Sequence, residues 1–288
     1  MADLKHIDRS SKGAPVFSWD APEVFLRLGL DEQRASLEVL KPEQRETWLR
    51  LLDEDPRKGR RNLAKSMRRK QERQNLLEAR LYALRNFDVE HAEGRLLAGV
   101  DEVGRGPLAG PVTAAAVILA PNFHAPGLDD SKRLSAEARE KWDPLIREQA
   151  LAWAVADLPA DSVDELGIRE CVFRVMRMAL ADLDPKAEIV LVDGREIPPG
   201  MQNAKAIIDG DARSLSVAAA SVIAKVHRDA IMRKFDSEYP GYDFAGNKGY
   251  GSASHLQALR EKGPCPLHRR SFLGRILAGS EEVARRSR

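Results

Sequence analysis

The 288-residue sequence predicts an α/β domain that follows a helical, basic N-terminal extension. From residue 21 to residue 95 apolar residues recur at helical spacing, whereas after residue 95 short apolar runs alternate with helical patterns. Alternation of strands and helices is typical of a mixed α/β domain. We therefore expect the extension to cover residues 1–94 and the α/β domain to cover residues 95–288.

The extension is expected to contain an irregular arm and at least two helices. Residues 1–20 include Gly, Pro and Ser and show no apolar period. Residues 41–52 have Pro42 near a helix start and place their apolar side chains on one side. Residues 62–87 form a longer helix candidate whose apolar stripe is clear only in its second half. We expect its first half to face solvent or a ligand.

The extension also carries a strongly basic segment, residues 56–80. Its formal charge is +8, although the whole chain carries only +2. A dense run of cations favours binding to a polyanion through counterion release. The alternative is a solvated helix face. The ten cations are Arg57, Lys58, Arg60, Arg61, Lys65, Arg68, Arg69, Lys70, Arg73 and Arg80.

Five short apolar runs are the expected strands of the α/β domain. They lie at residues 96–100, 112–119, 151–156, 188–192 and 204–208. Ser162 and Glu165 have the spacing of a capping box, and the helical pattern behind them stops at Asp184-Pro185. A second helix is expected at about residues 216–235.

Cysteine content and hydropathy indicate the cellular context. Cys171 and Cys265 show no metal-ligand spacing, and we expect no disulfide framework. The first ten residues lack the apolar core of a signal peptide. The longest apolar run, residues 112–120, is far too short to cross a membrane. We therefore expect a cytoplasmic protein without membrane contact, and, since nothing indicates an obligate dimer, a monomer.

Acidic residues stand at the ends of three expected strands: Asp101 and Glu102, then Asp193, then the turn at residues 209–211. Ligands gather at strand ends in open α/β sheets, and carboxylates that converge there repel one another unless a cation is bound. Ligand sets made only of oxygen favour Mg²⁺ or Mn²⁺. Two such ions about 4 Å apart can hold the attacking water and the leaving oxygen of a phosphodiester.

A Gly104-Arg105-Gly106 turn follows the first acidic pair and offers main-chain donors and a cation to a phosphate. Ordinary alternatives exist, because Asp-Gly pairs are common turn formers. Neighbours on a regular strand also point to opposite faces, so Asp101 and Glu102 reach one site only if the chain bends there. Three acidic strand ends beside this turn favour a metal site for phosphoryl transfer.

Residues 99–112, GVDEVGRGPLAGPV, resemble the signature of bacterial ribonuclease HII. Further similar blocks follow in the order of that family. The blocks are Asp130-Ser131-Lys132, LVDG at residues 191–194, residues 210–229, NKGYG at residues 247–251 and LHRRSF at residues 267–272. The resemblance covers residues 95–275, and the DPRK stretch at residues 55–58 is similar to one found in some members.

The resemblance implies a ribonuclease H-like fold, with a central mixed sheet flanked by helices and a helical C-terminal part. It implies hydrolysis of RNA in RNA/DNA hybrids and nicking 5′ of single ribonucleotides embedded in duplex DNA, leaving 3′-hydroxyl and 5′-phosphate ends. The implied partner is nucleic acid. The alternatives are a type HIII-like ribonuclease that acts on longer RNA stretches and a nucleic-acid-binding module without cleavage. Tyr250 and the lack of a strand-rich N-terminal domain favour type HII.

The resemblance also implies roles for four acidic residues. Asp101, Glu102 and Asp193 match the family's metal ligands, for Mg²⁺ or Mn²⁺. Asp211 matches the fourth acidic residue of the catalytic set. Where the family commonly has Lys-Gly-Asp, this chain has Asp209 before Gly210, which adds a negative charge near the expected site.

Six residues are implied to contact the substrate: Gly104, Arg105, Gly106, Ser131, Lys132 and Tyr250. The first three match the turn that reads the 2′-hydroxyl, the group that distinguishes RNA from DNA. The next two match positions that contact phosphate, and the tyrosine matches one that packs on the sugar next to the ribonucleotide. Lys225, His227 and Arg228 either line the duplex groove or form a solvated helix face.

Overall fold

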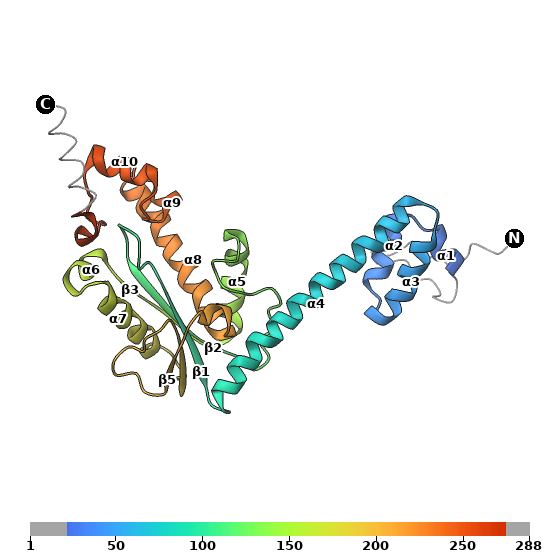
Figure 1. Ribbon diagram of the computed structural model, residues 1–288, viewed down its shortest axis with the longest axis horizontal. Helices are drawn as coiled ribbons and strands as arrows, with labels where there is room; N and C mark the ends of the chain where they lie inside the picture. The colour runs from blue at the N-terminus through green and yellow to red at the C-terminus, as the bar shows by residue number, and fades with distance from the viewer. Residues whose placement is uncertain (1–21, 275–288) are drawn as a thin grey trace. The chain divides into compact units, whose positions relative to one another are not determined.

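The computed structural model describes residues 22–274 (Figure 1). The chain divides into two compact units, one up to Glu78 and one from Ala79 onward. The predicted N-terminal arm, residues 1–20, lies outside the described residues. The functional boundary that we predicted between residues 94 and 95 stays a prediction.

The first unit is helical, as predicted. It consists of α1 (Pro22–Arg27), α2 (Leu30–Glu38), α3 (Pro42–Glu54) and the first part of α4 (Lys58–Ala92). Pro42 occupies the first turn of α3, where its missing N–H costs nothing. Residues of all four helices form one apolar core: Phe25, Leu28, Leu37, Trp48, Leu49, Leu52, Leu63, Ala64 and Met67.

The prediction that the first half of α4 faces solvent or a ligand was only partly right. Leu63 and Met67 are buried in the core of the first unit, because they lie one turn apart on the same side of the helix. The apolar stripe therefore extends through both halves of α4. It is narrow in the first half, where long cationic side chains flank it.

The second unit contains a five-stranded mixed sheet in the order β3-β2-β1-β4-β5. The strands are β1 (Leu97–Val103), β2 (Val112–Leu119), β3 (Ala150–Leu158), β4 (Ile189–Asp193) and β5 (Ala204–Ile207). β1 pairs antiparallel with β2 and parallel with β4. All five predicted strands are confirmed, but β1 is longer than predicted, so Asp101 and Glu102 lie within the strand.

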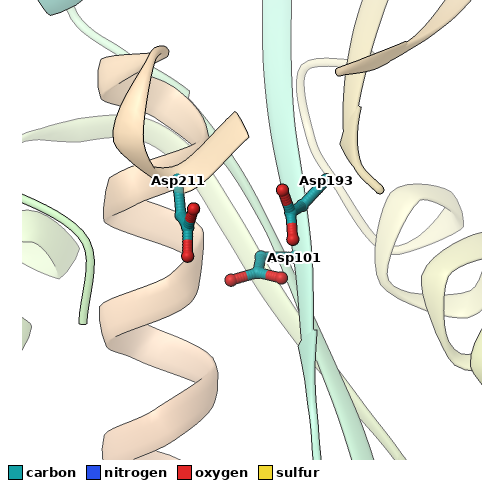
Figure 2. A group of neighbouring side chains, drawn as sticks. All are labelled: Asp101, Asp193 and Asp211. Carbon is teal, nitrogen blue, oxygen red and sulfur yellow. The ribbon is translucent and has the colours of Figure 1, made fainter. Parts of the chain in front are cut away.

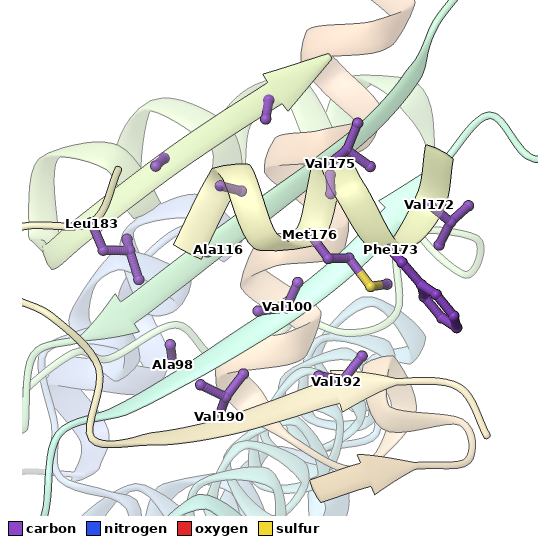
Figure 3. Packing of buried hydrophobic residues seen from close by; sticks show 14 of the residues in the cluster. Ala98, Val100, Ala116, Val172, Phe173, Val175, Met176, Leu183, Val190 and Val192 are labelled. Atoms are coloured by element: carbon purple, nitrogen blue, oxygen red, sulfur yellow. The ribbon is translucent and has the colours of Figure 1, made fainter. Parts of the chain in front are cut away.

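Helices cover both faces of this sheet, which gives three layers. The first face packs against α6 (Ala160–Leu166) and α7 (Ile168–Ala181). Figure 3 shows Val175 and Met176 of α7 near Val100 and Val192 of the sheet. The second face packs against α5 (Ala136–Gln149), α8 (Leu215–Glu238) and the last part of α4. The predicted central mixed sheet flanked by helices is confirmed.

The start of the predicted helix at Ser162 was wrong. α6 begins at Ala160 with Pro159 as its N-cap, so Ser162 lies inside the helix. Gly167, with φ +78°, ends α6 and precedes α7. A glycine adopts this left-handed conformation without steric cost, and the chain therefore forms two helices where one was expected.

The N-terminus of α8 lies very close to β1. A Cβ atom at Gly99 would lie 2.2 Å from the main-chain nitrogen of Val217, so only glycine permits this approach. Asp88 of α4 accepts hydrogen bonds of 2.8 Å from the main-chain nitrogen and the hydroxyl of Ser216. These contacts fix the start of α8, and with it the turn that precedes the helix.

The C-terminal part is helical, with α9 (Phe244–Asn247) and α10 (Ala253–Lys262). It packs around Met232 and Phe244 in an apolar cluster of its own. Among the helices of residues 22–274, none combines the length and the apolar character needed to cross a membrane.

Candidate active site

Three aspartates from separate elements converge beside the sheet. Asp101 lies in β1, Asp193 ends β4, and Asp211 lies in the short 3₁₀ helix η1 (Gly210–Ala212). Figure 2 shows their carboxylates facing one another, and one oxygen of each lies within 4.8 Å of the others. Val100 pairs with Val192 across the parallel strands, so Asp101 and Asp193 are the next residues on adjacent strands and project to the same side.

The turn before α8 brings Asp211 to this cluster. The main-chain nitrogen of Gly210 donates a 2.7 Å hydrogen bond to Oδ1 of Asp193, which ties the turn to the end of β4. Asp209 adopts the left-handed conformation, with φ 53°, and its side chain is exposed. The additional negative charge noted in the sequence therefore belongs to an exposed residue beside the three buried or half-buried aspartates.

Glu102 lies next to the three-aspartate cluster but outside it. Its side chain is paired with Arg105 at 3.3 Å, and its main-chain nitrogen donates a 2.7 Å hydrogen bond to Oδ1 of Asp101. Together with Asp193 and Asp209 it lines a cavity of about 430 Å³. The role of Glu102 as a metal ligand stays a prediction.

Electrostatic repulsion makes the cluster unfavourable without a cation. Burial, followed by the charges of Glu102, Asp193 and Asp211, raises the pKa of Asp101 well above its usual range. Burial and the charge of Asp211 also raise the pKa of Asp193. A divalent cation bound between the carboxylates would favour their ionised forms. Because the donors are all carboxylate oxygens, the set fits a hard ion such as Mg²⁺ or Mn²⁺.

Among the described residues, Lys132 is the cation that contacts the three-aspartate cluster directly. Its Nζ lies 2.9 Å from Oδ2 of Asp211. Partial burial opposes its charge, but the hydrogen bond and the charge of Asp211 raise the pKa of Lys132. The Lys132 side chain is largely exposed, with 76% of its surface accessible. It can therefore neutralise Asp211 and still meet an anion from solvent.

Ser131 is buried, unlike the neighbouring Lys132. Its hydroxyl accepts a 2.5 Å hydrogen bond from the hydroxyl of Ser221 in α8. Its carbonyl oxygen accepts a hydrogen bond from Arg139. The structure thus places the Ser131 side chain in the interior, where it fixes the loop that carries Lys132.

Two buried arginines organise the Gly-Arg-Gly turn and the segment that follows it, residues 104–111 together. Arg269 donates hydrogen bonds to five carbonyl oxygens, those of Gly104, Arg105, Pro107, Gly110 and Pro111. Arg228 donates to the carbonyls of Pro111, Ala109 and Lys248. Both guanidinium groups are fully buried. Burial of so large a charge is tolerated because its donors are satisfied by main-chain oxygens.

These two arginines were not predicted to shape the site. We expected Arg228 to line the duplex groove or to belong to a solvated helix face, and both alternatives were wrong, because its side chain points inward. Arg269 stood in the LHRRSF block without an assigned role. Little in the sequence indicated their burial, because an arginine in a helix or loop is ordinarily exposed. The pair leaves Arg105 and Gly106 exposed at the tip of the turn.

Gly104 is required at its position by geometry. Its φ is +94°, and a Cβ atom would lie 2.5 Å from Nε of Arg228 and 2.6 Å from the carbonyl oxygen of Pro111. Tyr250 lies beside the tip of the same turn: a Cβ atom at Gly106 would be 3.8 Å from Cε1 of Tyr250. Tyr250 is 44% exposed. Tyr250 and Gly106 thus form one surface.

Family models match most of the described chain. The model of ribonuclease HII matches residues 98–274, and the model of the ribonuclease HII N-terminal domain matches residues 31–92. The chain belongs to the ribonuclease HII family. The first match includes the three aspartates, the Gly-Arg-Gly turn and Tyr250, and the second covers most of the helical extension.

Curated relatives and a solved structure agree with this family. The chain is 52% identical over 180 residues to ribonuclease HII of Syntrophotalea carbinolica, a match that covers 62% of this chain and 86% of that protein. It is 43% identical to ribonuclease HII of Myxococcus xanthus over 88% of each chain. It is also similar to the crystal structure of ribonuclease H2 from Pyrococcus horikoshii, with a TM-score of 0.55, 26% identity and coverage of 66% of this chain and 98% of that one.

The predicted resemblance is therefore confirmed. The protein is an endoribonuclease of ribonuclease H type 2, in a family that acts on RNA/DNA hybrids with divalent metal ions. The ribonuclease H-like fold is confirmed as well.

Proposed function

We propose that this protein also nicks duplex DNA on the 5′ side of a single embedded ribonucleotide, leaving 3′-hydroxyl and 5′-phosphate ends. The placement of Tyr250 beside Gly106 supports this proposal best. An enzyme that acts on one ribonucleotide must read a 2′-hydroxyl at one position and an adjoining sugar at the next. A main-chain turn beside an exposed aromatic ring supplies both surfaces.

The three-aspartate cluster is the proposed metal centre, with Asp101, Asp193 and Asp211 as the ligands that the geometry favours and Glu102 beside them. When bound, Mg²⁺ or Mn²⁺ supplies Lewis-acid stabilisation of the phosphoryl oxygens and lowers the pKa of a water molecule. The three carboxylates, two buried and one half-buried, would hold the ion. Lys132 is placed to meet a phosphate oxygen of the substrate.

The Gly-Arg-Gly turn is the proposed reader of the ribonucleotide. Arg269 draws the carbonyl oxygens of Gly104 and Arg105 inward, so the exposed tip at Arg105 and Gly106 is left to face the substrate. The absence of a Cβ atom at Gly106 permits close approach of a sugar. Lys132 is the proposed phosphate contact of its loop, and the buried Ser131 hydroxyl supports that loop from behind.

We further propose that residues 1–94 form an extension that increases affinity for the duplex backbone. The structure divides the cations at residues 58–73 of α4 into two groups. Arg60, Arg68 and Lys70 form ion pairs with acidic side chains of the same unit. The opposite side of the helix carries what we term the basic stripe, at spacings of three or four residues: Lys58, Arg61, Lys65, Arg69 and Arg73. The charge of +8 counted from the sequence therefore overstates the free cationic charge.

Duplex cleavage with matched substrates tests the proposal that the protein nicks DNA beside a single ribonucleotide. Three labelled duplexes would be compared: one of DNA alone, one with a single ribonucleotide and one uniform RNA/DNA hybrid. We expect cleavage 5′ of the single ribonucleotide with either ion, ligatable 3′-hydroxyl ends, and no cleavage of pure DNA. Cleavage of the hybrid alone would favour the type HIII-like alternative.

We expect the protein to be a monomer that acts in the cytoplasm. Sedimentation of the intact chain checks the oligomeric state.

A further inference from the structure

Two buried histidines connect the Tyr250 loop to the segment that carries Arg269. His255 in α10 is fully buried, and His268 is 3% exposed. Their Nε2 atoms lie 3.0 Å apart. The other ring nitrogen of each contacts the main chain: Nδ1 of His255 lies 2.8 Å from the carbonyl oxygen of Tyr250, and Nδ1 of His268 lies 3.0 Å from the main-chain nitrogen of Cys265.

The two main-chain contacts determine where the protons lie. A carbonyl oxygen can only accept, so Nδ1 of His255 carries a hydrogen and its Nε2 is an acceptor. The N–H of Cys265 can only donate, so Nδ1 of His268 is an acceptor and its Nε2 carries a hydrogen. Two other groups of Cys265 lie 3.2 Å from the same Nδ1: the carbonyl, which accepts the main-chain N–H of His268, and Sγ, whose S–H can donate to that nitrogen. Every donor in the chain Cys265–His268–His255–Tyr250 then meets an acceptor.

Both rings must be neutral for this arrangement to hold, since a protonated imidazole would place two N–H groups against each other. Burial lowers the pKa of both histidines, and burial together with the neighbouring His255 lowers the pKa of His268 to about 4. Tyr242 and Phe244 pack around the pair with ring centroids 5.1–6.4 Å away. The pair is therefore a fixed hydrogen-bonded unit at neutral pH.

The unit lies where three segments of the site meet. The carbonyl of Gly249 accepts the main-chain N–H of Leu108, which follows the Gly-Arg-Gly turn. His268 forms an antiparallel bridge with Ala109 of the same segment. The main chain of Tyr250 is thus held to the turn on one side and to His255 on the other.

We propose that His255 and His268 are positioning residues for ribonucleotide recognition: the neutral N–H···N hydrogen bond from His268 keeps Nδ1 of His255 a donor to the carbonyl of Tyr250, and this donor holds Tyr250 beside Gly106. This inference rests on the role proposed above for Tyr250. It predicts that the donor to the carbonyl of Tyr250, and not only the bulk of the two rings, determines substrate preference. Preference here means kcat/KM for a duplex with one ribonucleotide divided by kcat/KM for a uniform hybrid.

Two amide substitutions separate the two bonds of His255. In His255→Asn the amide nitrogen takes the place of Nδ1 and can still donate to the carbonyl of Tyr250. In His255→Gln the amide takes the place of Nε2, so that the carbonyl of Tyr250 loses its donor. Because a buried acceptor without a partner shifts the loop, we expect preference to fall about tenfold in His255→Gln. His255→Asn removes the acceptor of His268 instead, so it should lower stability while preference stays within about threefold of wild type. Gln257→Ala, on the exposed side of the same helix, is the control.

Coupling to Tyr250 distinguishes positioning from general stability. In a Tyr250→Ala background, His255→Gln should cause no further loss of preference, although thermal unfolding still reports its effect on stability. A loss of preference that adds to that of Tyr250→Ala, or an equal loss on both substrates, would overturn the proposal. If Tyr250→Ala itself left preference unchanged, the proposed role of Tyr250 would fail, and positioning through Tyr250 would fail with it.

Nitrogen-15 NMR of the histidine rings tests the hydrogen-bonded unit independently of activity. At pH 7 we expect the Nδ1–H tautomer for His255 and the Nε2–H tautomer for His268, both neutral. Reversed tautomers or a charged ring would overturn the inference whatever the role of Tyr250. Correct tautomers with a normal preference in His255→Gln would overturn the positioning role alone.

Discussion

The buried guanidinium of Arg269 donates a 2.7 Å hydrogen bond to the carbonyl oxygen of Gly104. Four further carbonyls of the same segment point to the same side chain. A loop that contacts a ligand usually gains precision from rigid support behind it. Here the support is a single planar cation whose five N–H donors match inward-pointing carbonyls.

Replacement of Arg269 by lysine should destabilise the protein. An ammonium group cannot reach carbonyls spread over the plane of a guanidinium, so several buried oxygens would lose their donor. We expect the free energy of unfolding to fall by about 3 kcal/mol, measured by urea denaturation. Arg270→Lys, at an exposed neighbouring position, is the matched control. Equal stability of the two variants would show that Arg269 does not organise the turn.

Lys132→Ala should weaken substrate binding. The substitution removes the cation 2.9 Å from Asp211 and the proposed contact with phosphate. A charged hydrogen bond contributes about 1.5–3 kcal/mol, so kcat/KM should fall about 10- to 100-fold. Lys234→Ala removes an exposed lysine of α8 and should have little effect. Steady-state kinetics on a single-ribonucleotide duplex check this, and similar kinetics for the two variants would argue against the role of Lys132.

The basic stripe should determine the salt dependence of duplex binding. If Lys65, Arg69 and Arg73 each meet one phosphate, the triple glutamine variant should reduce the slope of log K against log salt by about 2 to 3. Lys70→Gln removes a lysine that is paired with Glu38, and should change the slope by less than about 1. Binding titrations at several salt concentrations measure both slopes. An unchanged slope in the triple variant would mean that the extension does not contact the duplex.

The histidine pair should make stability depend on pH in the acidic range. The pKa of His268 is about 4 in the folded state and about 6.5 in the unfolded chain, so the folded state binds fewer protons. Its contribution is complete above pH 6.5 and is lost as the pH falls to about 4, a change of about 3 kcal/mol. Urea denaturation of wild type and His268→Gln at several pH values measures this contribution to the free energy of unfolding. The stability difference between them should shrink toward pH 4, and a constant difference would contradict the assignment.

Much of the catalytic unit could be predicted from the sequence because strands and acidic ends leave local patterns. The apolar runs located all five strands, and the blocks around Asp101, Asp193 and Asp211 identified the family. The predicted first strand ended at residue 100, three residues too early, because a polar pair such as Asp101 and Glu102 after an apolar run usually indicates a turn. The break between α6 and α7 was not predicted, because the left-handed conformation of Gly167 depends on packing that no local pattern specifies.

Other features of the site depend on long-range contacts and had no local signal. The inward orientation of Arg228 arises from carbonyls more than 100 residues away, at Ala109 and Pro111. The burial of Ser131 depends on Ser221 of α8. The ion pairs that neutralise part of the basic segment involve acids of α2 and α3, which a count along the segment excludes.

A matched pair of substitutions in the candidate metal centre tests the central claim most directly. Asp193→Asn removes a carboxylate of the cluster, whereas Asp209→Asn removes an exposed carboxylate of the adjoining turn. Calorimetric titration with Mn²⁺ and cleavage of a single-ribonucleotide duplex would be measured on both. We expect Asp193→Asn to lose metal affinity and to lower kcat at least about 100-fold, and Asp209→Asn to stay within about threefold of wild type. Retained metal binding and cleavage in Asp193→Asn would contradict the account.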